Sequence, residues 1–155
     1  MKRKHVILLA VMLALVSPAI AAKAPNVLFL MSDDLNTALS GFGHPQCKTP
    51  ELDKLAERGM RFENMHCQYP VCGASRASLM SGLYPYTNGT LGNAGTLRGN
   101  MPNVVTMSQL FRKNGYRVGR VSKIYHMGIP PEILAGTATR DDPHSWDEVV
   151  NIKAP

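Results

Sequence analysis

The sequence predicts an α/β fold in which a mostly parallel central sheet is flanked by helices. An uninterrupted apolar run, Asn26–Ser32, is typical of a strand that is buried on both faces. Thr49 and Pro50 then open a helical pattern that ends at Gly59. Residues 116–121 alternate apolar and polar side chains, as a strand does. Strands that alternate with helices in this order favour parallel pairing through crossover connections.

The remaining elements follow from the positions of glycine, proline and apolar residues. We expect a weaker strand over 60–65, a short helix over 74–81, a long loop over 84–103, a helix over 104–114 and irregular surface chain from 130 onward. No internal repeat or low-complexity segment interrupts this order.

The N-terminus has the pattern of a secretory signal peptide over residues 1–21. Three basic residues within the first four positions precede the apolar run Val6–Val16, and small residues follow at 19–22. The apolar run is shorter than the roughly 20 residues of a membrane-spanning helix. Cleavage would lower the formal charge from +6 to +3, which weakens the case for a nucleic-acid partner. We therefore expect export, to the periplasm or outside the cell, with 22–155 as the mature chain.

Cysteine usage points to one unusual thiol. The sequence has three cysteines, Cys47, Cys67 and Cys72. In an exported chain an odd number leaves at least one thiol free, paired with another molecule or chemically special. Export would permit Cys47 and Cys67 to pair.

Asp33 and Asp34 follow the first predicted strand directly. Adjacent carboxylates repel each other unless a cation lies between them, and their oxygens suit calcium or magnesium. The alternative is a turn or a helix cap, where Asp is also common.

Cys72 and Arg76 are separated by one helical turn. At a helix N-terminus the free N–H groups favour an anion, and the Arg76 guanidinium can face the Cys72 side chain. This arrangement suits a tetrahedral oxyanion such as sulfate or phosphate. The alternative is a buried structural cysteine beside a surface arginine.

Lys123 and His126 follow the strand predicted over 116–121. A lysine can neutralise an anionic leaving group, and a histidine can exchange protons near neutral pH; a solvated lysine and a loop histidine are the alternative. Because ligands bind at the carboxyl ends of strands in open α/β sheets, we expect these residues to share one pocket with the two acids Asp33 and Asp34 and with Cys72 and Arg76.

Together these segments resemble the sulfatase family over about residues 25–150. Cys72-Gly-Ala-Ser-Arg76 is similar to the family signature of Cys or Ser, any residue, Pro or Ala, any residue, Arg. The segments 26–34, 49–59 and 115–126 resemble the metal-binding opening strand, the next helix and the second signature. The Lys-x-x-His spacing and Asp142-Pro-His-Ser-Trp146 most resemble the iduronate-2-sulfatase branch.

The resemblance implies an alkaline-phosphatase-like fold and sulfuric ester hydrolysis, with a sulfated small molecule, sugar or glycan as substrate. It implies that a formylglycine-generating enzyme oxidises Cys72 to formylglycine, whose aldehyde hydrates to a gem-diol. Asp33, Asp34 and the modified Cys72 would hold a calcium ion.

By the same resemblance, Arg76 would orient the diol, Lys123 would bind sulfate oxygens and His126 would assist proton transfer. Ser122 stands where the family usually has Gly, and a small residue is expected to be tolerated there. Sulfatases are several hundred residues long, so we expect this chain to be the N-terminal part of a catalytic domain that is inactive alone. Two alternatives stay open: a phosphate or phosphonate ester hydrolase of the same superfamily, and an inactive secreted fragment that binds anions.

Overall fold

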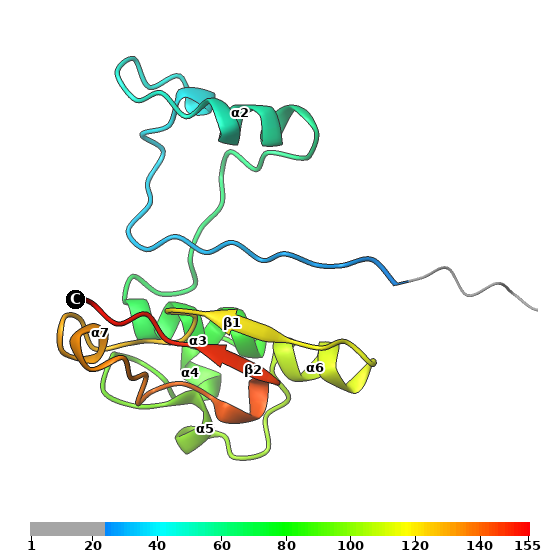
Figure 1. Cartoon of the computed structure of the whole chain (residues 1–155), viewed down its shortest axis with the longest axis vertical. Helices are drawn as coiled ribbons and strands as arrows, with labels where there is room; N and C mark the ends of the chain where they lie inside the picture. Colours follow the sequence, from blue (N-terminus) through cyan, green and yellow to red (C-terminus); the bar gives the residue numbers. More distant parts are fainter. Residues whose placement is uncertain (1–23) are drawn as a thin grey trace, which may run out of the picture. The chain divides into compact units, whose positions relative to one another are not determined.

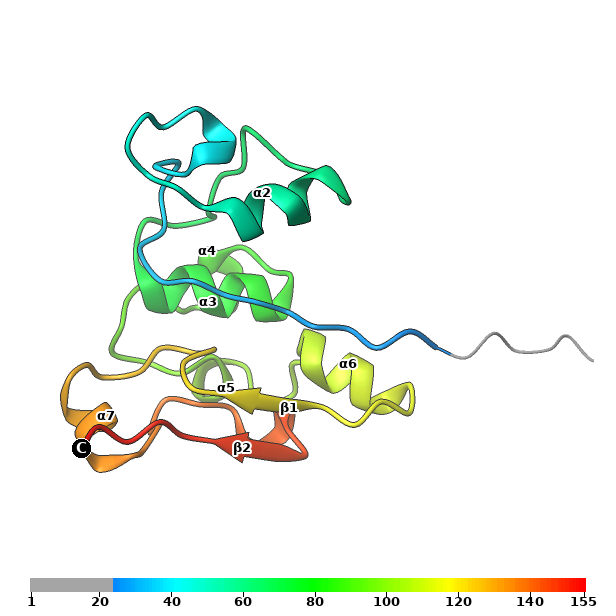
Figure 2. The same ribbon diagram turned by 45° about the horizontal axis from the view of Figure 1, so that its top comes forward.

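The computed structural model describes residues 24–155 (Figures 1 and 2). The predicted signal peptide, residues 1–21, lies outside the described residues. The chain divides into two units between Ser32 and Asp33, and only residues 24–32 of the first unit are described. The described part of the first unit contains neither helix nor strand.

The strand predicted over residues 26–32 is therefore wrong for this structure. Leu28 and Leu30 are 82% and 73% exposed, where the sequence predicted burial on both faces. An apolar run becomes a strand only when a neighbouring chain satisfies its N–H and C=O groups. Within residues 24–155 no strand pairs with this segment.

The second unit contains short helices and two strands. In chain order they are η1 (Ser40–Phe42), α2 (Pro50–Glu57), α3 (Cys72–Ser81), α4 (Pro85–Asn88), α5 (Leu97–Asn100), α6 (Met107–Lys113), β1 (Gly119–Val121), α7 (Pro131–Ala135), η2 (Pro143–Ser145) and β2 (Glu148–Val150). Figure 1 shows β1 and β2 as neighbouring arrows that point the same way. They pair in parallel, with Gly119 opposite Glu148 and Val121 opposite Val150. The parallel pairing expected for the fold class is confirmed in this small sheet.

The helices begin close to where the sequence places them. Pro50 opens α2 as predicted. Helix α3 begins at Cys72, two residues before the predicted start, and ends at Gly82, whose φ of 69° is left-handed. Helix α6 begins later than predicted because Thr106 caps it: the Thr106 side chain and Gln109 form a reciprocal capping box.

Three other expectations differ from the structure. Residues 60–65 form no strand; Met60, Phe62 and Met65 are exposed. The predicted loop 84–103 contains α4 and α5, and the predicted irregular tail contains α7, η2 and β2. These are elements of three to five residues, too short to display a hydrophobic period.

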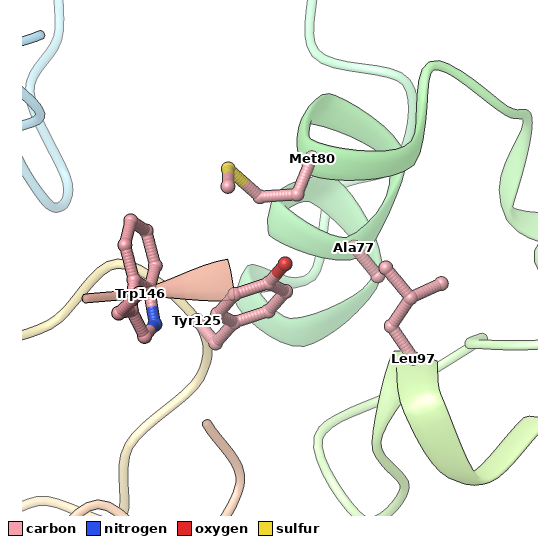
Figure 3. Packing of buried hydrophobic residues seen from close by; sticks show 5 residues of the cluster. All are labelled: Ala77, Met80, Leu97, Tyr125 and Trp146. Atoms are coloured by element: carbon pink, nitrogen blue, oxygen red, sulfur yellow. The ribbon is translucent and has the colours of Figure 1, made fainter. Parts of the chain in front are cut away.

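The core of the second unit forms along one face of helix α3. Ala77 and Met80 of α3 pack with Leu97 of α5 and with the aromatic pair Tyr125 and Trp146 (Figure 3). The two aromatic rings meet edge to face, with centroids 6.2 Å apart. This cluster joins α3 to the chain that follows β1 and to the end of η2.

Candidate active site at the N-terminus of helix α3

Cys72 is the first residue of α3, so it lies at a helix N-terminus, as expected, although the helix begins two residues earlier than predicted. The loop that connects α4 to α5 packs against this first turn. The Gly73 N–H donates a hydrogen bond to Asn93 Oδ1 of that loop at 2.7 Å. A Cβ at Gly73 would lie 2.3 Å from the Gly92 carbonyl oxygen. Glycine is therefore required at position 73 by the close approach of a loop about 20 residues away.

Arg76 lies against the Cys72 side chain and is held on two sides. Its Nε donates to Cys72 Sγ at 3.2 Å. Its Nη1 donates to the carbonyl oxygens of Lys123 and Ile124, at 3.1 and 2.9 Å. With only 8% of the side chain exposed, the guanidinium has a fixed orientation between α3 and the segment that carries Lys123.

Asp33 joins the two cations of the site. One carboxylate oxygen lies 3.2 Å from Arg76 Nη2, and the other pairs with Lys123 Nζ. The Cys72 thiol lies 3.9 Å from Asp33 Oδ1. The Lys123 hydrogen bond, aided by Arg76, lowers the pKa of Asp33 from its ordinary value although partial burial opposes this. The structure thus brings Asp33, Cys72, Arg76 and Lys123 together.

His126 lies near the same cations and has an unpartnered nitrogen. Its Nδ1 is buried and has no hydrogen-bond partner among the described residues. Burial, followed by the charges of Lys123, Arg140 and Arg76, lowers the pKa of His126 from its ordinary 6.5, and Glu132 opposes the shift. The imidazole is consequently neutral near pH 7 and able to accept a proton.

Asp34 is placed differently from Asp33. Its backbone is left-handed, with φ of 49°, its side chain is exposed and it makes no hydrogen bond to the described residues. Within residues 24–155 no three His, Cys, Asp or Glu side chains gather closely enough to hold a metal ion. The expected ligands Asp33, Asp34 and Cys72 are thus not assembled as one group of three.

Ser122, where the resemblance leads one to expect Gly, has a left-handed backbone with φ of 60°. This is the region that favours glycine, so serine at this position is strained. Its N–H donates to the Val150 carbonyl at 2.8 Å, which ties the turn to the end of β2. The strained turn immediately precedes Lys123.

Several features escaped the sequence analysis. The carbonyls of Lys123 and Ile124, which hold Arg76, have no sequence signature because every residue has one. The hydrogen bond from the Gly73 N–H to Asn93 forms only because a loop distant in sequence folds back onto the first turn of α3. All three cysteines are free thiols, so the permitted pair of Cys47 and Cys67 does not form in this structure. In the part of the chain that the structure describes, no helix is long and apolar enough to cross a membrane.

The chain is similar to known sulfatases in sequence and in structure. The Sulfatase family model matches residues 25–131. Arylsulfatase A of Bos taurus is 37% identical over 126 residues, covering 77% of this chain and 24% of the relative. Iduronate 2-sulfatase of Homo sapiens is 34% identical, with 79% of this chain and 22% of the relative covered. N-acetylglucosamine-6-O-sulfatase of Bacteroides thetaiotaomicron is 32% identical, with 84% and 24% covered.

The crystal structure of Ps i-CgsB superposes with a TM-score of 0.60 at 32% identity, over 76% of this chain and 25% of that one. The expected alkaline-phosphatase-like α/β fold is confirmed by this structural neighbour. The chain spans about a quarter of the length of the relatives it matches. Since the family model covers more than half of the sequence and the motif order agrees, the chain belongs to the sulfatase family.

Proposed function

We propose that this chain carries the nucleophile of a sulfuric ester hydrolase that acts on a sulfated sugar or glycan. The observation that carries the proposal is the convergence of Cys72 Sγ with the Arg76 guanidinium at 3.2 Å, at a helix N-terminus. The positive end of the helix dipole, the Arg76 guanidinium and the Lys123 ammonium suit an anionic ester group. Relatives named for sugar sulfates, such as N-acetylglucosamine-6-O-sulfatase, support the substrate class.

Under this proposal a formylglycine-generating enzyme, with dioxygen as the oxidant, would convert the CH₂SH group of Cys72 to an aldehyde and release the sulfur as sulfide, and water would add to the aldehyde to form a gem-diol. One hydroxyl attacks the sulfur of the ester, and the sugar alcohol leaves with a proton. The second hydroxyl then loses its proton, the C=O bond reforms, and the bond to sulfate breaks. The net reaction consumes one water and releases an alcohol and sulfate.

The neighbouring side chains have distinct roles in this scheme. Arg76, fixed by the carbonyls of Lys123 and Ile124, orients the diol and balances its charge. Lys123 binds the sulfate oxygens. His126, which burial and the nearby cations keep neutral, accepts the proton of the second hydroxyl.

Calcium fits the donor chemistry of the site in part. Asp33 lies beside Cys72, and carboxylate oxygens are ligands that calcium prefers. Calcium takes six to eight oxygens, so Asp33, Asp34 and the modified Cys72, with one oxygen each, would supply at most half of its ligands. When bound, the ion would supply positive charge next to the reacting ester.

The proposal is tested first at Cys72. In a host with the maturation enzyme, the peptide containing Cys72 should weigh about 18 Da less than its thiol form, because CH₂SH becomes CHO. Peptide mass spectrometry measures this, and the N-terminus of the secreted protein shows whether residues 1–21 are removed on export. An unmodified thiol throughout would refute the formylglycine assignment.

The reaction itself is tested with the purified, matured protein. Hydrolysis of aryl and sugar sulfates is compared with that of the matching phosphate esters, with and without a calcium chelator. Sulfate ester turnover that depends on calcium supports the proposal. Preference for the phosphate esters would instead assign a phosphate ester hydrolase.

A further inference from the structure

The adjacent acids Asp141 and Asp142 form separate buried ion pairs. Asp141 pairs with Arg120, and the two side chains are 12% and 3% exposed. Asp142 pairs with Arg98, with exposed fractions of 3% and 17%. None of these four residues enters the proposed chemistry. Burying a charge is costly, and a buried ion pair stabilises a fold less than apolar packing does. The hydrogen bonds of the two pairs show which backbone segments they hold.

The Asp141 pair holds the beginning of the segment 122–126. Arg120 Nε donates to Asp141 Oδ2 at 2.7 Å. Arg120 Nη1 donates to the Ser122 carbonyl, also at 2.7 Å. Trp146 Nε1 donates to the other Asp141 oxygen at 3.0 Å. The Asp141 pair therefore fixes the carbonyl of the strained Ser122 turn directly before Lys123, while the Ser122 N–H is held separately by the Val150 carbonyl of β2.

The Asp142 pair holds the end of the same segment. Arg98 donates to both Asp142 oxygens, from Nε at 3.1 Å and Nη2 at 2.7 Å. Ser145 Oγ donates to Asp142 Oδ2 at 2.8 Å and lies 3.1 Å from the Tyr125 hydroxyl. Tyr125 stands between Ile124, whose carbonyl holds Arg76, and His126.

We infer that Asp141 and Asp142 are positioning residues of the active site, a clamp that fixes segment 122–126 at both ends. This inference rests on the proposed function of that site. The segment supplies two side chains of the site, Lys123 and His126, and the two carbonyls that orient Arg76. Displacement of the segment by about 1 Å therefore misplaces three functional groups together, which can lower a rate by about 10²-fold.

The test compares Asp141→Asn and Asp142→Asn with Asp147→Asn as a matched control. Asp147 is the next acid along the chain; it pairs with Arg112 on the surface, and its other side-chain hydrogen bond is to the Val118 N–H, outside segment 122–126. All three variants are assayed well below their own melting temperatures. The clamp predicts that kcat falls at least about tenfold for the first two with KM within about threefold, while Asp147→Asn stays within about twofold. Equal loss in all three variants would overturn the inference, because loss of stability alone would then suffice.

A second readout does not depend on sulfatase activity. In protein produced without the maturation enzyme, iodoacetamide alkylation of Cys72 is followed by peptide mass spectrometry, and the Cys47 and Cys67 peptides serve as internal references. If the segment shifts, Arg76 moves away from Cys72 Sγ, which it contacts at 3.2 Å, so the alkylation rate of Cys72 changes relative to the references. The control variant keeps the parent ratio.

The two readouts separate the possible failures. A parent protein that hydrolyses no sulfate ester would refute the proposed function, while the alkylation ratio still decides whether the clamp exists. If Asp141→Asn or Asp142→Asn fails to fold, Tyr125→Phe is tested in its place, because it keeps the aromatic ring in the core and removes only the hydroxyl. Its alkylation ratio should move in the same direction by a smaller factor. A parent-like ratio in every folded variant would overturn the clamp.

Discussion

Replacement of Gly73 by alanine tests how the nucleophile's helix is positioned. Gly73 is the second residue of the Cys72–Arg76 signature, a place where the family tolerates any residue. In this protein the Gly92 carbonyl and the Asn93 side chain cover it. An added methyl group would meet backbone, and backbone cannot move aside as the end of a flexible side chain can.

The magnitude follows from three contributions. The new Cβ would lie 2.3 Å from Gly92 O, and ordinary contact begins at 3.4 Å, so the loop must retreat by about 1 Å. Overpacking of this kind costs about 1–3 kcal/mol, and loss of the Gly73–Asn93 hydrogen bond costs about 1 kcal/mol more. Alanine regains about 0.5–1 kcal/mol through its higher helix propensity. The free energy of unfolding should therefore fall by about 1–3.5 kcal/mol.

The assay is thermal unfolding of Gly73→Ala beside Gly92→Ala. At Gly92 an added Cβ has no neighbour within 4 Å, so that variant should match the parent. For a domain of this size, Gly73→Ala should melt roughly 3–10 °C lower. Equal melting temperatures for the two variants would show that the loop does not pack on the first turn of α3.

Three further predictions concern the segment around the site. Ser122→Gly should raise the free energy of unfolding by about 0.5 kcal/mol, because glycine adopts the left-handed backbone without strain; chemical denaturation measures it, and lower stability would contradict the assigned φ. Arg140→Gln should raise the pKa of His126 by removing one of the charges that lower it, as NMR titration of the imidazole would show. Because that folded-state pKa lies below the ordinary 6.5, the parent should lose stability as pH falls from about 6.5 through it; a His126 pKa above 6.5 would refute this sign. Asp33→Asn should weaken calcium binding at least about tenfold and remove most turnover, because it removes the negative charge of the proposed calcium ligand that also pairs with Lys123. Calorimetry measures the calcium affinity and steady-state kinetics the turnover; parent-like values of both would contradict this prediction.

The site was more predictable than the sheet because its geometry is local. Cys72 and Arg76 are four residues apart, and a helix of that length brings them to one end whatever else the chain does. The strand expected over 26–32 depends on a partner elsewhere in the protein, and the described residues supply none. Strand β2 was missed for the same reason: its three residues form a strand only through pairing with β1.

The requirement for glycine at 73 and the clamp at 141–142 show a different limit. The roles of Gly73 and of Asp141 and Asp142 cannot be predicted from their residue types, because each role depends on a partner that is distant in sequence. For Gly73 the partner is the Gly92 carbonyl, and for the two acids it is the guanidinium groups of Arg120 and Arg98. The resemblance singled out the motif beginning at Asp142 without assigning it a purpose. Contacts across about 20 to 45 residues of sequence supply that purpose.

Segment 122–126 contributes both to the stability of the fold and to the proposed chemistry. Tyr125 anchors it in the core, the Ser122 carbonyl and N–H fix its first turn, and Lys123 and His126 project the groups that the reaction would use. A left-handed serine is retained at its start although glycine would be less strained, and strain of this kind persists only where the surroundings over-determine the backbone. Substitutions in this segment should therefore change stability and turnover together, whereas a surface pair such as Arg112–Asp147 should affect stability alone.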